Sequence, residues 1–251
     1  MALKEIKKDS VAFLMPCGGD VPPRVVQSAL NLITTSAVQG ITVRQIGITD
    51  RTLVHTARNY LAAGFLDTEC EWAFWMDSDM ILQPDTIVRM LGWAKRLDAK
   101  MLTGIYYQRM GDHKPVVWRK KVVSTDGNIV HEGVDEYSHY YVYPKEVGGP
   151  PYKVDTAGFG CVLIHRSVFD DVEYPYFRFV FYKDREGKPC EASEDFYFFV
   201  QAKKAGHQLW AVPELDCGHV APGKIIRHAD MKIDLDKMTE MKIDYEKEAV
   251  R

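Results

Sequence analysis

Two aspartates that flank a serine, Asp77 and Asp79, form a D-x-D motif directly after the continuous apolar segment 72–76. We expect this segment to be a buried strand, and open α/β sheets bind their ligands at the carboxyl ends of such strands. Carboxylates there can bind Mg²⁺ or Mn²⁺ beside a phosphate-bearing ligand, because hard cations prefer oxygen donors. A turn with two solvated acids is the alternative. A second pair of this spacing, Asp234 and Asp236, lies in the charged C-terminal segment, where solvated acids are the simpler interpretation.

Two further acids, Glu194 and Asp195, stand in the first turn of a segment with helical character, residues 193–205. Ser193 is of a residue type that caps helices, and Gly206 ends the segment. The positive end of a helix stabilises ionised carboxylates, so both acids are expected to be charged. Simple capping and acid-base chemistry are both compatible with this placement.

The first half of the chain alternates between strand and helix patterns. Asp20 and two prolines at 22 and 23 favour the start of the first helix, which Gly40 ends. Strands are expected at residues 11–16, 41–48, 72–76 and 101–106, with helices from about 22 to 40 and at 52–66 and 84–97. This order predicts a doubly wound, mostly parallel sheet with the D-x-D motif at its carboxyl edge.

After about residue 107 the pattern changes to short strand-like segments separated by turn signals. These segments lie at residues 116–123, 140–143, 162–165, 176–182 and 208–212, and the helix at 193–205 precedes the last of them. We expect a mixed, partly antiparallel second half. Residues 223–251 are highly charged and are predicted to form an amphipathic helical tail.

Composition narrows the class of protein. Hydrophobic residues make up 46% of the 251 residues and charged residues 27%, which suits a globular protein with a buried core and excludes disordered and collagen-like classes. No apolar run is long enough to span a membrane and residues 1–10 lack a secretory segment, so we expect a cytoplasmic protein. A net charge of −3 gives no global basic excess for nucleic acid. Cys217, His219 and His228 match no standard zinc spacing.

Three motifs in this order resemble a GT-A-fold, family-two-like glycosyltransferase: Ala57-Arg58-Asn59, the segment 74–79, and Ser193-Glu194-Asp195. The resemblance spans about residues 10–220, and the size is similar to that of small phage and bacterial glycosyltransferases. It implies a single α/β, Rossmann-like catalytic domain over residues 1–222, with a mostly parallel central sheet and a mixed second half. Residues 10–107 would bind the nucleotide sugar, residues 108–222 would bind the acceptor, and 223–251 would follow as the helical tail. The implied location is the cytoplasm of a bacterial or phage-infected cell.

The resemblance also implies a site for a nucleoside-diphosphate-sugar donor, preferably a UDP-sugar, with Mn²⁺ or Mg²⁺. The loop after the first strand would hold the base and ribose, an arginine would reach the base or the diphosphate, and the first acid of the D-x-D motif would orient the ribose. A late histidine would join the two aspartates at the metal; an ordinary loop or core histidine is the alternative. The residues implied for the donor are Pro16, Cys17, Gly18, Arg51, Arg58, Asp77 and Ser78. Those implied for the metal are Asp77, Asp79 and His219.

In the same family an acid at the start of the later helix acts as general base, which gives this role to Glu194 or Asp195. We favour Asp195. It would deprotonate an acceptor hydroxyl while the metal neutralises charge on the leaving diphosphate, without a covalent intermediate. An aspartate here favours inversion at the anomeric carbon. A D-x-D motif with a late histidine also resembles retaining families, so the stereochemistry stays open.

Aromatic and basic residues interleave over residues 106–121, the region that lines the acceptor cleft in the family. Aromatic rings stack on sugars and on nucleobases, so a hydroxyl of a glycan, a small molecule, a protein or a modified nucleobase is a candidate acceptor. The small-residue segment 155–161 would pass beneath the transferred sugar, where glycine allows close approach of the backbone. A solvated hairpin and a β-bulge are the respective alternatives. The acceptor residues implied are Tyr106, Tyr107, Arg109, His113, Lys114, Trp118, Arg119, Lys120 and Lys121.

The sequence thus predicts a metal-dependent glycosyltransferase, with two alternatives. One is a sugar-nucleotide nucleotidyltransferase, which is disfavoured because the loop 17–20 lacks the Arg and Lys expected around a triphosphate. The other is a non-catalytic module that binds glycan or nucleic acid, against which the intact Asp77, Asp79 and Asp195 argue. The sequence determines neither the donor sugar, nor the acceptor, nor the oligomeric state.

Overall fold

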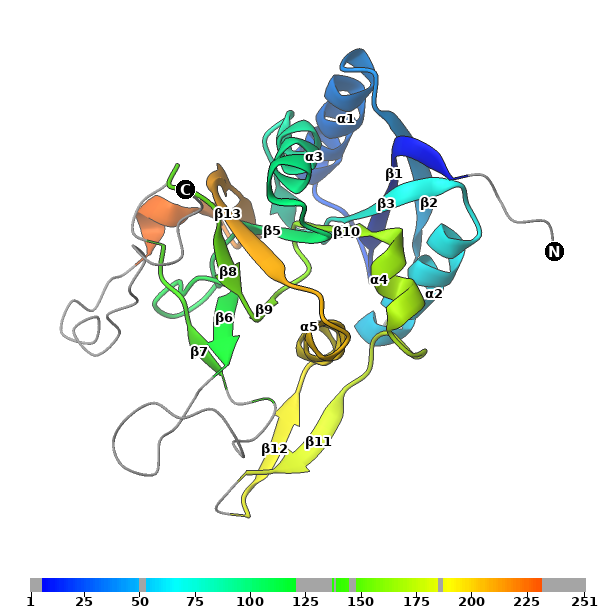
Figure 1. Cartoon of the computed structure of the whole chain (residues 1–251). Helices are drawn as coiled ribbons and strands as arrows, with labels where there is room; N and C mark the ends of the chain where they lie inside the picture. The colour runs from blue at the N-terminus through cyan, green and yellow to red at the C-terminus, as the bar shows by residue number, and fades with distance from the viewer. Residues whose placement is uncertain are drawn as a thin grey trace.

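The computed structural model describes residues 6–49, 53–120, 137, 139–144, 148–184 and 187–231. Its largest element is a seven-stranded sheet (Figure 1). In spatial order the strands are β2 (Thr42–Thr49), β1 (Lys7–Pro16), β3 (Cys70–Trp75), β10 (Val162–His165), β5 (Met101–Ile105), β13 (Leu209–Asp216) and β8 (Tyr152–Val154). β1 is parallel to β2 and β3, and β5 to β13, whereas β10 is antiparallel to both of its neighbours and β8 to β13. The sheet is therefore mixed, with a parallel part at its N-terminal strands.

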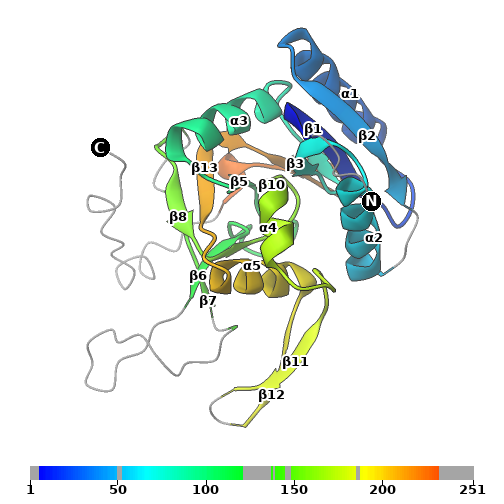
Figure 2. The same ribbon diagram turned by 45° about the vertical axis from the view of Figure 1, so that its right-hand side comes forward.

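Two layers of helices cover this sheet (Figure 2). One layer is α1 (Pro23–Val38) and α3 (Thr86–Leu97), and the other is α2 (Val54–Leu66), α4 (Arg166–Asp171) and α5 (Glu194–Lys204). Successive side chains of a strand point to opposite faces, so Phe13 of β1 packs in the core on the α1–α3 side and Leu14 in the core on the other. Because both faces are covered, β1 is apolar without alternation over most of its length.

Smaller sheets extend the second half of the chain. β4 (Met80–Ile81), β14 (Gly218–Ala221) and β15 (Lys224–Ile226) form one, and β6 (Val117–Lys120), β7 (His139–Tyr141) and β9 (Thr156–Ala157) form another. The hairpin of β11 (Val180–Lys183) and β12 (Pro189–Ala192) projects from the domain just before α5 (Figures 1 and 2). The last element in the described part of the chain is a single 3₁₀ turn, η1 (His228–Asp230).

The predicted alternation of strands and helices in the first half is confirmed, with boundaries shifted by a few residues. The central sheet is less parallel than expected because β10 enters between β3 and β5 in the opposite direction. Its apolar sequence fits a buried strand of either direction, so the pattern could not reveal this. The short helix α4 has no counterpart in the prediction, since six residues are too few to show a helical period.

Three expectations about boundaries are wrong. The C-terminal helix does not begin at residue 223: Gly223, with a φ of 76°, makes the turn into β15, which pairs with β14. Residues 232–251 of that expected tail lie outside the described residues. The strand expected at 176–182 begins only at Val180. Asp20 does not cap α1, whose N-cap is Pro22 and makes no side-chain cap bond.

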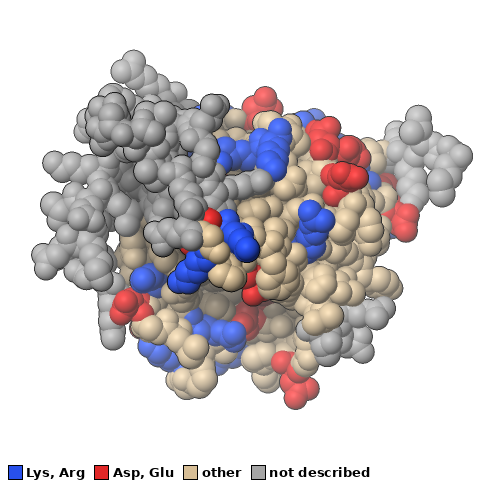
Figure 3. Space-filling model, turned by 90° about the horizontal axis from the view of Figure 1, so that it is seen from below, with Lys and Arg blue, Asp and Glu red and all other residues tan. Residues whose placement is uncertain are grey.

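Charges are mixed on the surface. The face seen from below shows Lys and Arg side chains interspersed with Asp and Glu (Figure 3). This agrees with a small net charge of −3 rather than with a broad basic face. Among the described residues, no helix combines the length and the apolar character needed to cross a membrane.

Candidate active site

A cavity lies where β1 and β3 end side by side at the carboxyl edge of the sheet. Its volume is about 210 Å³. It is lined by the loop after β1, the start of α2 and the turn after β3: Pro16, Cys17, Gly18, Val54, Ala57, Arg58, Asp77, Ser78 and Asp79. The structure thus brings together the residues predicted for the donor, apart from Arg51, which lies outside the described residues.

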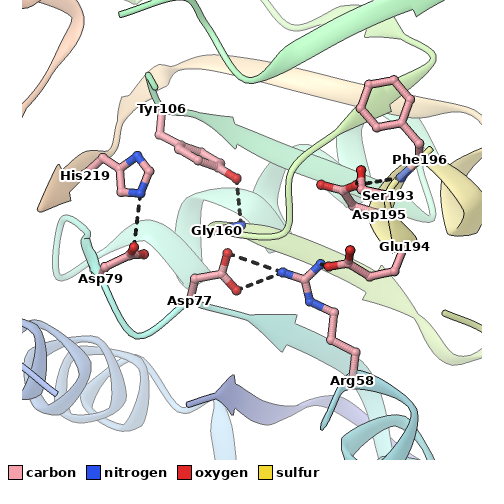
Figure 4. A network of polar contacts seen from close by, with 10 residues as sticks. All are labelled: Arg58, Asp77, Asp79, Tyr106, Gly160, Ser193, Glu194, Asp195, Phe196 and His219. Carbon is pink, nitrogen blue, oxygen red and sulfur yellow. Dashed lines mark hydrogen bonds and ion pairs between the residues drawn. The ribbon is translucent and has the colours of Figure 1, made fainter. Parts of the chain in front are cut away.

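A tight turn separates the two aspartates of the D-x-D motif. The backbone N–H of Met80 donates to the carbonyl of Asp77 at 3.2 Å, and β4 then pairs with β14. The two carboxylates therefore face different neighbours: Asp77 meets Arg58 of α2, and Asp79 meets His219 of β14 (Figure 4). The two acids of one short motif belong to two separate clusters.

Arg58, Asp77 and Glu194 form a group of ion pairs, which we call the Arg58 cluster; Arg58 and Glu194 are buried, whereas 26% of the Asp77 side chain is exposed. Arg58 Nη2 donates to Asp77 Oδ1 at 3.0 Å, and Nη1 donates to Glu194 Oε1 at 2.6 Å (Figure 4). The guanidinium also lies 4.8 Å from the ring centroid of Phe159, and only 5% of the Arg58 side chain is exposed. Both terminal nitrogens donate to protein carboxylates, so Arg58 connects α2, the D-x-D turn and α5, and it also lines the cavity; its contact with a base or diphosphate stays a prediction.

Burial and charge oppose each other in the Arg58 cluster. Burial lowers the pKa of Arg58, but the carboxylates of Asp77, Glu194 and Asp195 outweigh it and hold that pKa above its ordinary value. Burial is also the largest influence on Glu194 and, despite Arg58, raises its pKa to about 6. Burial raises the pKa of Asp77 as well. Arg58 therefore stays charged, while Glu194 takes up a proton more readily than an ordinary glutamate.

Asp79, His219 and Arg109 form a second group, which we call the Asp79 cluster. His219 Nε2 lies 3.3 Å from Asp79 Oδ2, and Arg109 Nη1 lies 3.0 Å from the same oxygen. Strand pairing brings in the histidine from 140 residues further along the chain, because β14 pairs with β4 and places His219 opposite Met80. Burial raises the pKa of Asp79, but the hydrogen bond to His219 and the charges of His219 and Arg109 bring it below its ordinary value.

The second ring nitrogen of His219 holds the imidazole in place. Nδ1 lies 2.7 Å from the carbonyl oxygen of Tyr107, which can only accept, so Nδ1 carries the proton and donates it. Nε2, the atom nearest Asp79, then donates to that carboxylate when the imidazole is protonated and offers its lone pair to a cation when the imidazole is neutral. A histidine anchored through one nitrogen by a carbonyl is the usual arrangement of a metal ligand.

The predicted metal ligands are not assembled as a group of three. Asp77 is bound to Arg58, and the part of the chain that the structure describes contains no three His, Cys, Asp or Glu side chains arranged to hold a metal ion. Cys217, His219 and His228, the residues considered for zinc, likewise form no such group among the described residues. Asp79 and His219 together still present one carboxylate oxygen and one imidazole nitrogen at a single point. Two such ligands fit a divalent cation that completes its coordination with phosphate oxygens and water.

Asp195 lies on the opposite side of the Arg58 cluster from Asp79 (Figure 4). Its Oδ1 accepts hydrogen bonds from the hydroxyl of Ser193 and, at 2.8 Å, from the backbone N–H of Phe196. Ser193 is the N-cap residue, as expected, but its side chain makes no cap bond and orients the Asp195 carboxylate instead. Both hydrogen bonds fall on Oδ1, so they do not use the lone pairs of Oδ2.

No protein-family model and no curated protein matches this chain. Among solved structures, A197 from STIV matches with a TM-score of 0.52 and 18% identity, over 87% of this chain and 93% of that one. GalNAc-T7, solved with UDP, GalNAc and Mn²⁺, matches with a TM-score of 0.52 and 10% identity over 86% of this chain, and this chain spans 44% of GalNAc-T7. The fold is GT-A. The predicted fold class is thereby confirmed.

In this GT-A fold the small-residue segment 155–161 packs against a tyrosine. A Cβ atom on Gly158 would lie 2.0 Å from the Tyr106 hydroxyl oxygen, and one on Gly160 would lie 2.9 Å from the Tyr106 ring. The backbone N–H of Gly160 donates to that hydroxyl at 3.3 Å. A contact within the protein therefore already requires both glycines. The passage of this segment beneath a transferred sugar stays a prediction.

Part of the predicted acceptor region adjoins Asp195. The ring of Trp118 in β6 lies 4.8 Å from that of Phe196 and 5.4 Å from that of Tyr141, centroid to centroid. All three rings are partly exposed. Phe196 follows Asp195 in α5 and its backbone N–H donates to the Asp195 carboxylate, whereas its ring points away from that carboxylate (Figure 4).

Other residues predicted for the acceptor have different partners. Tyr107 is buried, and its carbonyl accepts from the histidine of the Asp79 cluster. Arg119 donates two hydrogen bonds to the carbonyl of Lys153. Arg109 contacts the D-x-D motif, on the donor side of the site. Lys121 lies outside the described residues.

Some contacts at the site carry no local sequence signal. Arg58 and Glu194 are 136 residues apart, and Arg109 reaches the D-x-D motif from a separate loop. The contact of Ser193 with Asp195 does have such a signal, because a short polar side chain often bonds a neighbour two residues away. That signal predicts a local hydrogen bond without distinguishing a helix cap from an oriented carboxylate.

Proposed function

We propose that this protein is a glycosyltransferase that moves a sugar from a nucleoside-diphosphate donor, preferably UDP-linked, to an acceptor hydroxyl with Mn²⁺ or Mg²⁺. One observation carries the proposal: the Asp79–His219 pair, Asp195 and a cavity of about 210 Å³ are grouped at one edge of the sheet (Figure 4). The GT-A fold supports it, because GalNAc-T7, which shares this fold, was solved with UDP and Mn²⁺.

Charge around the cavity favours a donor that binds together with a cation. The two clusters and Asp195 contain four carboxylates against two guanidiniums, which leaves a net charge of −2 when His219 is neutral. A nucleoside diphosphate is itself negative and would be repelled. A divalent cation held by Asp79 and His219 would remove this repulsion and neutralise the charge that develops on the leaving diphosphate.

Asp195 is the general base of this proposal. Its Oδ2 takes the proton of the acceptor hydroxyl while that oxygen forms a bond to the anomeric carbon, and the bond between this carbon and the diphosphate oxygen breaks with its electron pair. The hydroxyl of Ser193 and the N–H of Phe196 hold the carboxylate in position. Glu194 is less suited, because it is buried and paired with Arg58. The reaction inverts the configuration at the anomeric carbon.

The aromatic cluster of Trp118, Tyr141 and Phe196 suits an acceptor that presents a flat ring face. Aromatic side chains stack on the apolar faces of sugars and on nucleobases. An acceptor ring that stacks on these side chains would lie beside the start of α5, the helix that carries Asp195. A glycan, a glycosylated small molecule or protein, and a modified nucleobase all meet this requirement.

Isothermal titration with UDP, GDP, CDP and UTP, each with and without Mn²⁺, tests the proposal. We expect micromolar binding of one nucleoside diphosphate that depends on Mn²⁺. Binding of UTP alone would favour a nucleotidyltransferase. Binding of none of the four would contradict the donor site and favour a non-catalytic module.

Turnover of the Asp195→Asn variant tests the base. Asparagine keeps the shape of the side chain but cannot take up the proton, so turnover should fall by roughly 10²–10⁴ while affinity for the nucleoside diphosphate is retained. Asp98→Asn is a matched control, because Asp98 is an exposed C-cap residue of α3 in the left-handed conformation that asparagine tolerates. Near-normal turnover of Asp195→Asn would exclude this residue as the base.

A further inference from the structure

Arg109 and His219 approach the same oxygen atom of Asp79. Arg109 Nη1 lies 3.0 Å from Asp79 Oδ2, and His219 Nε2 lies 3.3 Å from it. A carboxylate oxygen that accepts from a guanidinium presents less negative charge to a second cation at the same place. Arg109 would therefore compete with a divalent cation for this oxygen of Asp79.

The backbone that carries Arg109 is well anchored. The N–H of Gln108 donates to the carbonyl of Lys114 at 2.9 Å, which closes a short loop at its base. Within the loop, Nδ1 of the buried His113 donates to the carbonyl of Gln108 at 2.8 Å, so Nε2 can accept from Lys224 Nζ at 3.1 Å. Lys224 stands at the turn between β14 and β15, so the loop is joined to the hairpin that also carries His219.

The side chain of Arg109 is free to reorient in a way that Arg58 is not. About half of it is exposed, 52%, whereas 5% of the Arg58 side chain is exposed. An exposed ion pair contributes little to stability and exchanges readily with water and ions. The guanidinium of Arg109 carries five N–H donors in a planar arrangement that matches the oxygens of a phosphate. A fixed loop with a free side chain suits a group that changes partners.

We propose that Arg109 is a cation that changes partners: it binds Asp79 in the free protein and moves to the diphosphate of the donor when a divalent cation binds at Asp79 and His219. This inference rests on the proposed function and adds a residue to the donor site. It makes Arg109 a competitor of the metal when no nucleotide is bound, and a ligand of the diphosphate when nucleotide and metal are both present. Loss of Arg109 should therefore affect the two binding equilibria in opposite directions.

The test compares wild type with Arg109→Gln in two titrations. In the first, Mn²⁺ alone is titrated and its binding followed by electron paramagnetic resonance; the variant should bind Mn²⁺ about threefold to fivefold more tightly, because the competing charge is gone. In the second, UDP is titrated calorimetrically at saturating Mn²⁺; the variant should bind UDP about tenfold more weakly, because a charge-assisted hydrogen bond is lost. Arg96→Gln is the matched control, since Arg96 lies on Trp93 of α3 and should change neither titration.

Two results would overturn the inference: both affinities unchanged in Arg109→Gln, or both changed in the same direction. Arg109→Lys is a further test, because lysine keeps the positive charge but lacks the planar set of N–H donors. Mn²⁺ affinity of this variant should stay near that of wild type, while its UDP affinity should fall. The wild-type titration separates this inference from the proposed function. If wild type binds no nucleoside diphosphate with Mn²⁺, the proposed function fails and this inference with it, whereas wild-type binding with an unaffected Arg109→Gln refutes the role of Arg109 alone.

Discussion

The arginines of the Arg58 cluster and the Asp79 cluster are in opposite surroundings. Each pairs an arginine with one aspartate of the D-x-D motif at 3.0 Å. Arg58 is buried and holds a second carboxylate, that of Glu194, whereas Arg109 is half exposed. A buried ion pair cannot open without leaving a charge unpaired, whereas an exposed pair opens at little cost.

This difference shows that proximity in sequence does not give two residues the same task. The two aspartate side chains are exposed to nearly the same extent, 26% for Asp77 and 28% for Asp79, but Asp77 is paired with a buried arginine that joins α2 to α5, whereas Asp79 is paired with a half-exposed one. The structure therefore suggests a division of the motif into a scaffold half and a binding half. Four predictions test this division, and they are ordered here from the largest expected effect to the smallest.

Asp79→Asn should abolish the gain in UDP affinity that Mn²⁺ provides, because the principal oxygen ligand loses its charge. The measurement is calorimetric titration of UDP with and without Mn²⁺. The same variant should unfold at nearly the wild-type urea concentration, since an ion pair with the half-exposed Arg109 contributes little to stability. An undiminished Mn²⁺ dependence would show that the metal binds elsewhere.

Arg58→Met should lower the free energy of unfolding by about 3–5 kcal/mol, because the buried carboxylate of Glu194 and the partly buried carboxylate of Asp77 lose their cation. Urea unfolding followed by circular dichroism measures this loss. Arg109→Met is the matched control and should change the free energy of unfolding by less than about 1 kcal/mol. Equal losses in the two variants would remove the distinction between the clusters.

His219→Ala should weaken binding of Mn²⁺ in the presence of UDP by about tenfold, a smaller effect than that of Asp79→Asn. The imidazole contributes one neutral ligand, and its loss leaves the carboxylate of Asp79 in place. Competition of Mn²⁺ with a fluorescent chelator gives the affinity. An unchanged affinity would make His219 an ordinary structural histidine that links β14 to the Tyr107 carbonyl.

The loss of stability in Arg58→Met should depend on pH. Burial raises the pKa of Glu194 from 4.5 to about 6, so the folded protein holds this proton more tightly than the unfolded chain, and stability falls as the pH rises through that window. Without Arg58 the pKa rises further and the fall is larger. The difference in free energy of unfolding between wild type and Arg58→Met should therefore be about 1 kcal/mol smaller near pH 5 than near pH 8. A difference that does not vary with pH would show that Glu194 is not the group left unpaired.

Local patterns in the sequence predicted much of the fold. Apolar runs with turn residues at their ends located β1, β2, β3 and β5, and helical spacing located α1, α2, α3 and α5, because these signals depend on neighbours within one or two turns. The same signals could not give the direction of β10 or the existence of α4. A buried strand is apolar in either direction, and a helix of six residues is shorter than two full turns.

The candidate site shows the same boundary between local and long-range information. The sequence by itself determined that two aspartates end an apolar strand and that two acids begin a late helix, since both facts follow from residues adjacent in the chain. Only the tertiary structure decided that Asp77 and Glu194 share one buried arginine, that Asp79 meets His219 and Arg109, and that Asp195 is held by Ser193. Strand pairing and burial select those partners. In two of the contacts, Arg58 with Glu194 and Asp79 with His219, the two residues are more than 100 positions apart in the chain. Burial of the partner arginine then separates the two aspartates, because an ion pair with a buried arginine is fixed, while a half-exposed arginine can be replaced by an ion.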